Sequence, residues 1–342
     1  MNDKKNELNW LSKDQTDCLK GIFAVLVLLH HVRAQMSCLN DTIIGMIFTA
    51  MGFLSVGVFL FFSGYGLETQ FKKKGNNYII NMPYTRIIPF YGICVASILL
   101  YATERIIIGN YFSLKEFGQS FLFGRTIVQN GWFLQAIILV YFIYYIAHRL
   151  NFIKSSWLKL GILLVGYMIL CLMLNTSVTY FESILAFPLG IYISQNREAV
   201  YGWIFGKFKI IKCLITCTLF SVTLIVGSLG VLGEKFSVIF KMICVVFFSL
   251  LVIILSNSIS FENSGTKFLG QIFCEIYVIQ GLFISLFHST YIYIKNEWLY
   301  LIVVCCITVA IAWIMHPLFI KIMKSVRNIF RNRMQGDEEC VK

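Results

Sequence analysis

Residues 17–33 read DCLKGIFAVLVLLHHVR, an apolar run that begins beside a lysine and ends in two histidines and an arginine. On an α-helix, Lys20 and His31 are separated by a rotation of roughly 1100°, which returns them to within about 20° of one face, with roughly 16 Å between them along the axis. Adjacent residues point about 100° apart, so His30 and His31 cannot share one role. The fold depends on whether this helix lies in a membrane.

The composition favours a membrane protein. Of 342 residues, 58% are hydrophobic and 13% are charged, against about 25% charged in soluble domains. Apolar runs of about 20 residues recur, which is the length that crosses a hydrocarbon core of about 30 Å. We therefore expect an all-α, polytopic bundle in the lipid bilayer that forms one domain over residues 1–342.

The net charge of +12 also invites a nucleic-acid interpretation. The basic residues, however, gather in alternate hydrophilic gaps, as the positive-inside rule predicts. They form no basic face interleaved with base-stacking aromatic residues. We therefore expect no nucleic-acid partner.

About ten membrane spans are predicted. The gaps after the second, fourth and sixth spans are basic, as are both chain ends, and an even number of spans with basic ends predicts both termini in the cytoplasm. The N-terminal segment 1–17 is too polar to be a cleavable signal, and a basic tail follows at 320–342, so we expect a multi-pass protein of the cytoplasmic membrane. The spans are expected at about 18–36, 43–66, 86–104, 131–148, 157–174, 180–194, 211–231, 237–256, 268–288 and 298–319.

Two further features limit the chemistry. The eleven cysteines show neither metal-ligand nor disulfide spacing, so we expect no metal site and no permanently bound cofactor. The apolar patch 117–123 is too short to cross a membrane and is predicted to be interfacial or re-entrant. Since no large soluble domain is evident, the membrane bundle itself must carry any activity.

Ionisable side chains inside membrane spans are costly and mark functional sites by default. His30, His31 and Arg33 lie in the first predicted span, and Asp17 and Lys20 lie at its cytoplasmic mouth. The plainer alternative is that one histidine bonds a neighbouring helix while the other sits near the interface.

Small residues follow in the second span, and an arginine between prolines precedes the third. Ser63 and Gly64, next to Tyr65, would allow either a close backbone approach or a local break in the helix. Arg86 lies between Pro83 and Pro89, where it could clamp a phosphate or carboxylate or serve as an ordinary positive-inside anchor.

Two later segments also contain candidate residues. Trp132 opens the fourth span, where anchoring at the interface is the default interpretation. In the ninth span, Gln271 and Glu275 are spaced to share one helix face, and Tyr277 follows. A carboxylate at Glu275 must be paired or protonated, either as a partner to a histidine or as a lock within the bundle.

In order along the chain, these motifs resemble those of the acyltransferase 3 family of bacterial integral-membrane acyltransferases. Asp17, Leu19, Lys20 and Gly21 fit the family's opening Asp-x-Leu-Arg-Gly segment, with His31 in register as its histidine. The stretches GVFLFFSGY at 57–65, RIIPFY at 86–91, WFL at 132–134 and the 270–277 segment resemble later signatures. Two departures matter: Lys20 lacks the bidentate fork of arginine, and Gln280 stands where many members carry histidine.

The resemblance implies acyl transfer, with acetyl as the leading acyl group, from acyl-CoA to a hydroxyl of an envelope carbohydrate or lipid-linked glycan. His31 would be a general base with a pKa suited to that role or a covalent relay, and His30 would be secondary. Lys20 and Arg86 would hold the CoA phosphates. The remaining candidates are assigned to the substrate cavity: Asp17, Arg33, Ser63, Gly64, Tyr65, Trp132, Glu275 and Tyr277.

Two alternatives to the enzyme stay open. A transporter or flippase for a small solute or lipid-linked sugar would suit the spans and breaks near Gly64 and Pro188, although the two halves are not similar. A membrane scaffold for polysaccharide assembly is the third option, and it would tolerate loss of His31.

Overall fold

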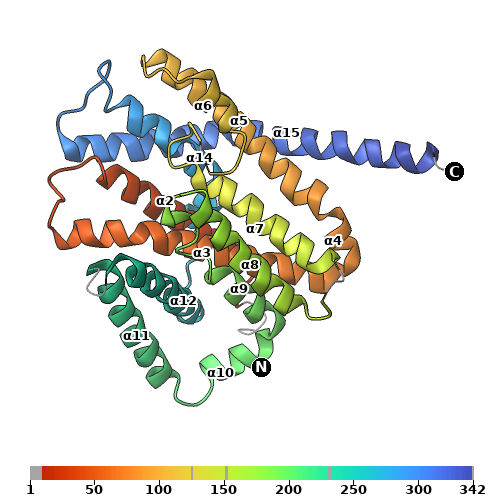
Figure 1. Ribbon diagram of the computed structural model, residues 1–342. Coiled ribbons are helices and arrows are strands. Elements are labelled where there is room, and N and C mark those ends of the chain that lie inside the picture. The colour runs from red at the N-terminus through yellow and green to blue at the C-terminus, as the bar shows by residue number, and fades with distance from the viewer. Residues whose placement is uncertain (1–9, 125, 151–152, 230–232, 341–342) are drawn as a thin grey trace. The chain divides into compact units, whose positions relative to one another are not determined.

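The computed structural model describes residues 10–124, 126–150, 153–229 and 233–340. Within these ranges the regular elements are helices (Figure 1), apart from one isolated bridge between His288 and Tyr293. The all-α prediction is therefore confirmed. The chain divides into two compact units, which are described separately: unit 1 comprises 1–73, 181–277 and 297–305, and unit 2 the remainder.

Among the described residues, seven helices are long and apolar enough to cross a membrane. A helix pair bent by 72°, Ser264–Gln271 and Phe273–Leu286, raises the number to eight if it counts as one span. The protein is thus a multi-pass membrane protein, while the count of ten and the cytoplasmic termini stay predictions. The seven are Ile43–Lys74, Asn76–Ile107, Trp132–Arg149, Ser156–Met173, Lys209–Ser228, Phe236–Ser258 and Glu297–Ile329.

Two of the ten predicted spans do not meet the criteria of length and apolarity. Helix α2, Lys13–Arg33, has 21 residues and is long enough, but its histidines and charged residues reduce its apolarity. Helix α9, Ala186–Gln195, has ten residues, so its length of about 15 Å is half of a hydrocarbon core of about 30 Å. A 3₁₀ turn, Val178–Tyr180, precedes it, so residues 180–194 do not form the single spanning helix that the sequence predicts.

Unit 1 is built around α2. The helix starts at Ser12, whose side chain accepts a hydrogen bond from the Gln15 backbone nitrogen. It packs backbone to backbone against α13, the helix Ser264–Gln271. The approach is so close that a Cβ added at Gly21 would lie 2.4 Å from the Gly270 nitrogen. Unit 1 also contains α3 (Ile43–Lys74), α9, α10 (Arg197–Phe205), α11 (Lys209–Leu229), α12 (Glu234–Ser258), α13 (Ser264–Gln271) and the first residues of α14 (Phe273–Leu286) and α15 (Glu297–Cys340).

Helix α3 is continuous, so the break considered near Gly64 is absent. Its glycines instead bring helices together: a Cβ on Gly64 would lie 2.2 Å from the Phe187 carbonyl oxygen, and one on Gly190 would lie 2.0 Å from the Phe61 carbonyl oxygen. Close approach was therefore the correct alternative for this segment. Pro188 lies in the first turn of α9, where a helix tolerates proline.

Unit 2 begins with α4 (Asn76–Met82), a π-helical turn (Pro83–Ile87) and α5 (Ile88–Ile107). Helices α7 (Trp132–Arg149) and α8 (Ser156–Met173) follow α6 (Leu114–Gln119), and the later parts of α14 and α15 complete the unit. In the capping box of α6, hydrogen bonds from Ser113 lower the pKa of Glu116. The aromatic residues around α6 pack on α5, so the 117–123 patch does not cross the membrane: Phe112, Phe117 and Phe121 contact a cluster that includes Tyr101.

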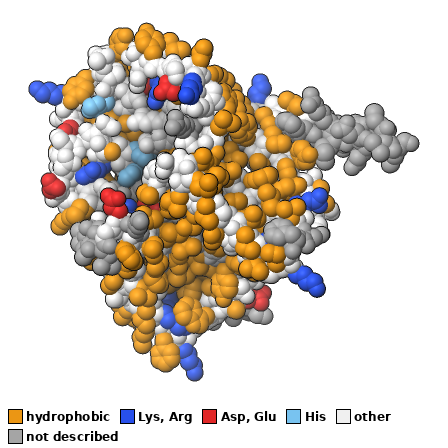
Figure 2. Space-filling view, viewed as in Figure 1, with side chains coloured by type: hydrophobic (Ala, Val, Ile, Leu, Met, Phe, Trp, Pro, Cys, Tyr) orange, Lys and Arg blue, Asp and Glu red, His pale blue; other side chains and the backbone are white. Residues whose placement is uncertain are grey.

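The outer surfaces of the helices are apolar. In Figure 2, hydrophobic side chains cover much of the face in view, and charged ones are few and scattered. Exposed side chains on α11 include Ile210, Ile211 and Leu214. In α2, by contrast, every large apolar side chain is buried or half-buried. A bilayer would cover the apolar faces, and α2 can carry polar groups because its neighbours in unit 1 enclose it.

Candidate functional site

The start of α2 carries a small charge network. Lys20 Nζ lies 2.9 Å from an Asp17 carboxylate oxygen, and Lys13 Nζ lies 3.7 Å from the other oxygen of that carboxylate. The Lys20 ammonium also lies 5.6 Å from the centre of the Phe273 ring. Since α2 is unbroken, Lys20 remains roughly 16 Å along the axis from His31, so the lysine cannot be a direct partner of that histidine.

His30 is anchored to α3. Its Nδ1 lies 3.0 Å from the Phe48 carbonyl oxygen, and because a carbonyl oxygen only accepts, Nδ1 must carry the proton. The ring also packs against Gly52, where an added Cβ would lie 2.6 Å from both Nε2 and Cε1. His30 is therefore held against α3 by the hydrogen bond of Nδ1 and by the packing of its ring on Gly52.

His31 has a different environment. Its ring lies edge-on to that of His30, with 4.8 Å between the ring centres and 63° between the planes. The side chain is half-buried, and among the described residues it has no hydrogen-bond partner. Nδ1 of His30 is hydrogen-bonded to the backbone of α3, so His31 is the histidine of the pair with neither ring nitrogen bonded to a neighbouring helix within the described residues.

The space for His30 depends on Gly52. We expect Gly52→Ala to lower acyl transfer by about tenfold, because the added methyl group would displace the His30 ring and with it His31; a shift of about 1 Å at a reacting group can cost on the order of 100-fold. The measurement is the rate of acyl-CoA turnover at matched protein abundance. Gly66→Ala is the control, since nothing lies within 4 Å of its added Cβ; equal rates for the two variants would contradict the expectation.

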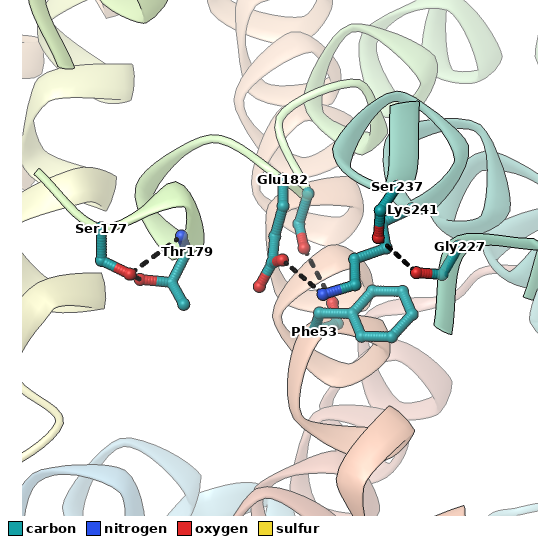
Figure 3. Close-up of polar contacts among 8 residues, drawn as sticks. Phe53, Ser177, Thr179, Glu182, Gly227, Ser237 and Lys241 are labelled. Atoms are coloured by element: carbon teal, nitrogen blue, oxygen red, sulfur yellow. Dashed lines mark hydrogen bonds and ion pairs between the residues drawn. The ribbon is translucent and has the colours of Figure 1, made fainter. Parts of the chain in front are cut away.

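An ion pair from other segments packs against α3 at Phe53, the residue that follows Gly52. Lys241 Nζ on α12 lies 3.4 Å from a Glu182 carboxylate oxygen and 5.5 Å from the centre of the Phe53 ring. Figure 3 shows the ammonium between that carboxylate and that ring. The Ser183 hydroxyl donates to the Phe53 carbonyl oxygen at 2.8 Å. One short stretch of α3 thus holds His30 on one side and the ion pair on another.

Sequence reasoning missed this pair, although a signal was present. Glu182 and Lys241 are ionisable residues inside the predicted spans 180–194 and 237–256, and such residues are functional candidates by default. The family motifs point to the histidines instead. Nothing in the sequence shows that Glu182 and Lys241, 59 positions apart, would meet.

The other candidates of unit 1 are distributed along the bundle. Arg33 is half-buried, and its Nη2 donates to Asn40 Oδ1 at 3.3 Å. Tyr65, Glu275 and Tyr277 are buried, at 7%, 4% and 7% exposure, and Ser63 is half-buried beside the Gly64 crossing.

The predicted i, i+4 relation of Gln271 and Glu275 is wrong. Helix α13 ends at Gln271 and α14 restarts at Phe273, with a bend of 72° between the two helices. The regular helix geometry that would align the two side chains is therefore interrupted. Glu275 lies instead in the first turn of α14.

The remaining two candidates belong to unit 2. Arg86 is exposed on the π-helical turn, a distortion often found at functional sites. Trp132 is the first residue of α7 and lines a cavity of about 530 Å³. Of the predicted site residues, the structure brings together Asp17 with Lys20 and His30 with His31.

No group of three or more His, Cys, Asp or Glu side chains suited to a metal ion occurs within the part of the chain that the structure describes. The two basic residues that the sequence analysis assigns to CoA phosphates lie in different units, Lys20 in unit 1 and Arg86 in unit 2.

Comparisons with known proteins place the chain in a family. The family model for an acyltransferase domain, acyltransferase 3, matches residues 14–316. Comparison with curated proteins and with solved structures finds no match. The family match covers the histidine helix and nearly all of both units, and it favours an enzyme over the transporter and scaffold alternatives. The chain belongs to the acyltransferase 3 family and is a membrane acyltransferase.

Proposed function

We propose that this enzyme transfers an acyl group, acetyl in the first instance, from acyl-CoA to a hydroxyl of a cell-envelope carbohydrate in the cytoplasmic membrane. The observation that carries the proposal is the asymmetry of the histidine pair. His30 is hydrogen-bonded to the Phe48 carbonyl oxygen and packs on Gly52, whereas His31 is half-buried and neither of its ring nitrogens is bonded to another described residue. An imidazole with a free lone pair suits a general base.

In the proposed reaction His31 takes the proton of the acceptor hydroxyl as the oxygen attacks the thioester carbonyl. The new C–O ester bond forms, the C–S bond breaks, and the CoA thiolate leaves with the bonding electron pair. The imidazolium then returns its proton to that thiolate, so the products are the acylated carbohydrate and free CoA thiol. A relay through an acyl-histidine would use the same group as a nucleophile.

In this proposal the CoA phosphates contact Lys20 of unit 1, and Arg86 of unit 2 is a separate candidate for the same role. The side chain of Lys20 is 22% exposed, so an incoming phosphate can reach its ammonium and exchange with Asp17. The roughly 16 Å from Lys20 to His31 along α2 is comparable with the reach of an extended CoA arm. Arg86, exposed on its turn, offers the bidentate geometry that lysine lacks.

We expect Lys20→Met to raise the KM for acetyl-CoA about tenfold, because one charge-assisted contact to phosphate is removed. Lys20→Arg should keep or lower this KM, since it restores a fork suited to phosphate. Steady-state release of CoA thiol from purified protein measures both. Lys13→Met is the matched control, because Lys13 contacts the same Asp17 carboxylate but is 89% exposed; a KM effect as large as that of Lys20→Met would argue against a specific clamp.

The proposal as a whole is tested with acetyl-CoA labelled in the acetyl group. Membranes containing the protein should release CoA thiol and place the label, as an alkali-labile ester, in the carbohydrate fraction, and membranes without it should not. Label transfer that is independent of the protein, or transfer to protein or lipid acyl chains instead of carbohydrate, would overturn the assignment.

A further inference from the structure

Unit 2 contains a cavity that the histidine site does not explain. Its volume is about 530 Å³, within the range of about 300–1,000 Å³ in which proteins hold small molecules. The walls come from the last turns of α5, the segment before α7 and one residue of α14. Its principal polar and aromatic lining residues are Tyr101, Glu104, Arg105, Gln129, Trp132 and Ser285.

Glu104 presents an unused acceptor. Its Oε1 is buried and has no hydrogen-bond partner among the described residues. A buried polar atom left in this state costs free energy unless a ligand or water completes it. Because a carboxylate accepts hydrogen bonds, the group that fits beside it is a donor such as a hydroxyl.

Gln129 presents the complementary donor. The Ser285 hydroxyl oxygen lies 2.5 Å from Gln129 Oε1 and 2.8 Å from the Gly281 carbonyl oxygen, and its single proton can be donated to only one of them. The Oε1 end of the amide faces Ser285, and its NH₂ group is the other polar end. Within the described ranges no acceptor is bonded to that NH₂ group. Tyr101, another lining residue, donates its hydroxyl proton to the Val278 carbonyl oxygen at 3.0 Å.

The third wall is an aromatic ring held by a constrained turn. Asn130 has a φ of 59°, in the left-handed region, and at Gly131 a Cβ would lie 2.6 Å from Val128 Cβ. This turn starts α7 at Trp132, whose ring is braced by Tyr180 with 5.7 Å between the ring centres. The indole is therefore a fixed, flat apolar surface at the edge of a polar cavity.

A flat aromatic surface, a carboxylate acceptor and an amide donor suit a ring that carries hydroxyl groups. One face of a sugar ring is largely C–H and packs on indole, while its hydroxyls both donate and accept. An acyl chain would leave the polar lining unpaired. The positive-inside orientation predicts that these ends of α5 and α7 lie on the outer side of the membrane, where envelope glycan is present.

We propose that this cavity binds one sugar unit of the acceptor glycan, with Trp132 packing on the ring and Glu104 and Gln129 bonding its hydroxyls. This inference rests on the proposed function insofar as the acceptor is a carbohydrate. The cavity is a binding site for the acceptor, and its three residues select the acceptor but take no part in the acyl transfer step.

The test is a titration of the purified full-length protein in detergent with maltose, chitobiose and galacturonic acid, and with glycerol as an acyclic polyol. We expect a saturable change in tryptophan fluorescence with at least one ring sugar, absent with glycerol. Trp132→Phe should abolish the change, and Glu104→Gln should weaken apparent affinity about tenfold. The matched controls Trp157→Phe and Glu198→Gln, at exposed positions, should leave it intact.

The absence of saturable binding with every sugar, or binding that survives in Trp132→Phe, would overturn the site. Turnover assays separate this failure from failure of the proposed function. If His31→Ala removes acetyl-CoA turnover while the cavity variants bind sugars like the wild type, the enzyme assignment stands and the cavity assignment falls. If the site is correct, Glu104→Gln raises the KM for the glycan acceptor and leaves the KM for acetyl-CoA unchanged.

Discussion

Replacing His31 with alanine is expected to lower kcat for acyl transfer by about 10²- to 10⁴-fold, the usual contribution of a positioned general base. The expectation follows from the geometry: His30 is hydrogen-bonded to the backbone of α3, whereas within the described part of the chain neither ring nitrogen of His31 is bonded to another residue. The measurement is acetyl-CoA turnover by purified protein, together with O-acetylation of envelope glycan in cells at equal membrane abundance of the two proteins.

The neighbouring histidine provides the internal control. His30→Asn retains a side-chain N–H that can donate to the Phe48 carbonyl oxygen, as Nδ1 does in the wild type, so this variant should keep activity within about tenfold. His31→Gln keeps an acceptor but cannot take a proton near neutral pH, and it should be as impaired as His31→Ala. Undiminished acyl transfer by His31→Ala, or equal losses of activity in His31→Ala and His30→Asn, would contradict the assignment of His31 as the base.

The first helix was largely predictable from sequence. Its length and register follow from an apolar run of helical spacing between Lys20 and His31, and the structure has an unbroken helix across Lys13–Arg33. What the spacing could not provide is the difference between the two histidines, because that difference depends on Phe48 and Gly52 of a second helix. The angular positions of side chains along one helix follow from local sequence spacing. The residues that they contact on other helices do not.

The fold shows the same limit at the ninth predicted span. Hydropathy alone treats 268–288 as one apolar segment, but Gly21 and Gly270 bring α2 and α13 into backbone contact, and the chain bends at Ile272 between α13 and α14. Helix breaks inside a membrane occur where protein encloses the freed backbone groups. A local sequence pattern cannot identify such an enclosure, and the ion pair of Glu182 and Lys241 was missed for the same reason.

That ion pair leads to the largest expected change in stability. Lys241→Met should destabilise the protein by about 3 kcal/mol, because Glu182, only 8% exposed, would lose its counter-charge in an apolar bundle. The value lies at the lower end of the range for buried pairs because the lysine side chain is 28% exposed. Removing both charges together, in Glu182→Gln/Lys241→Met, should restore stability to within about 1 kcal/mol of the wild type, since no buried charge remains unpaired.

The measurement is the midpoint of unfolding of purified protein in mixed detergent micelles, for Lys241→Met and for the double variant. Lys267→Met is the matched control, because Lys267 and Glu262 form a pair at 4.0 Å with side chains 51% and 34% exposed, and exposed pairs contribute about 0–1 kcal/mol. A double variant as unstable as Lys241→Met would mean that packing around Phe53, and not the charge of Glu182, determines the loss. A Lys241→Met midpoint no lower than that of Lys267→Met would mean that water or lipid headgroups already stabilise the Glu182 carboxylate.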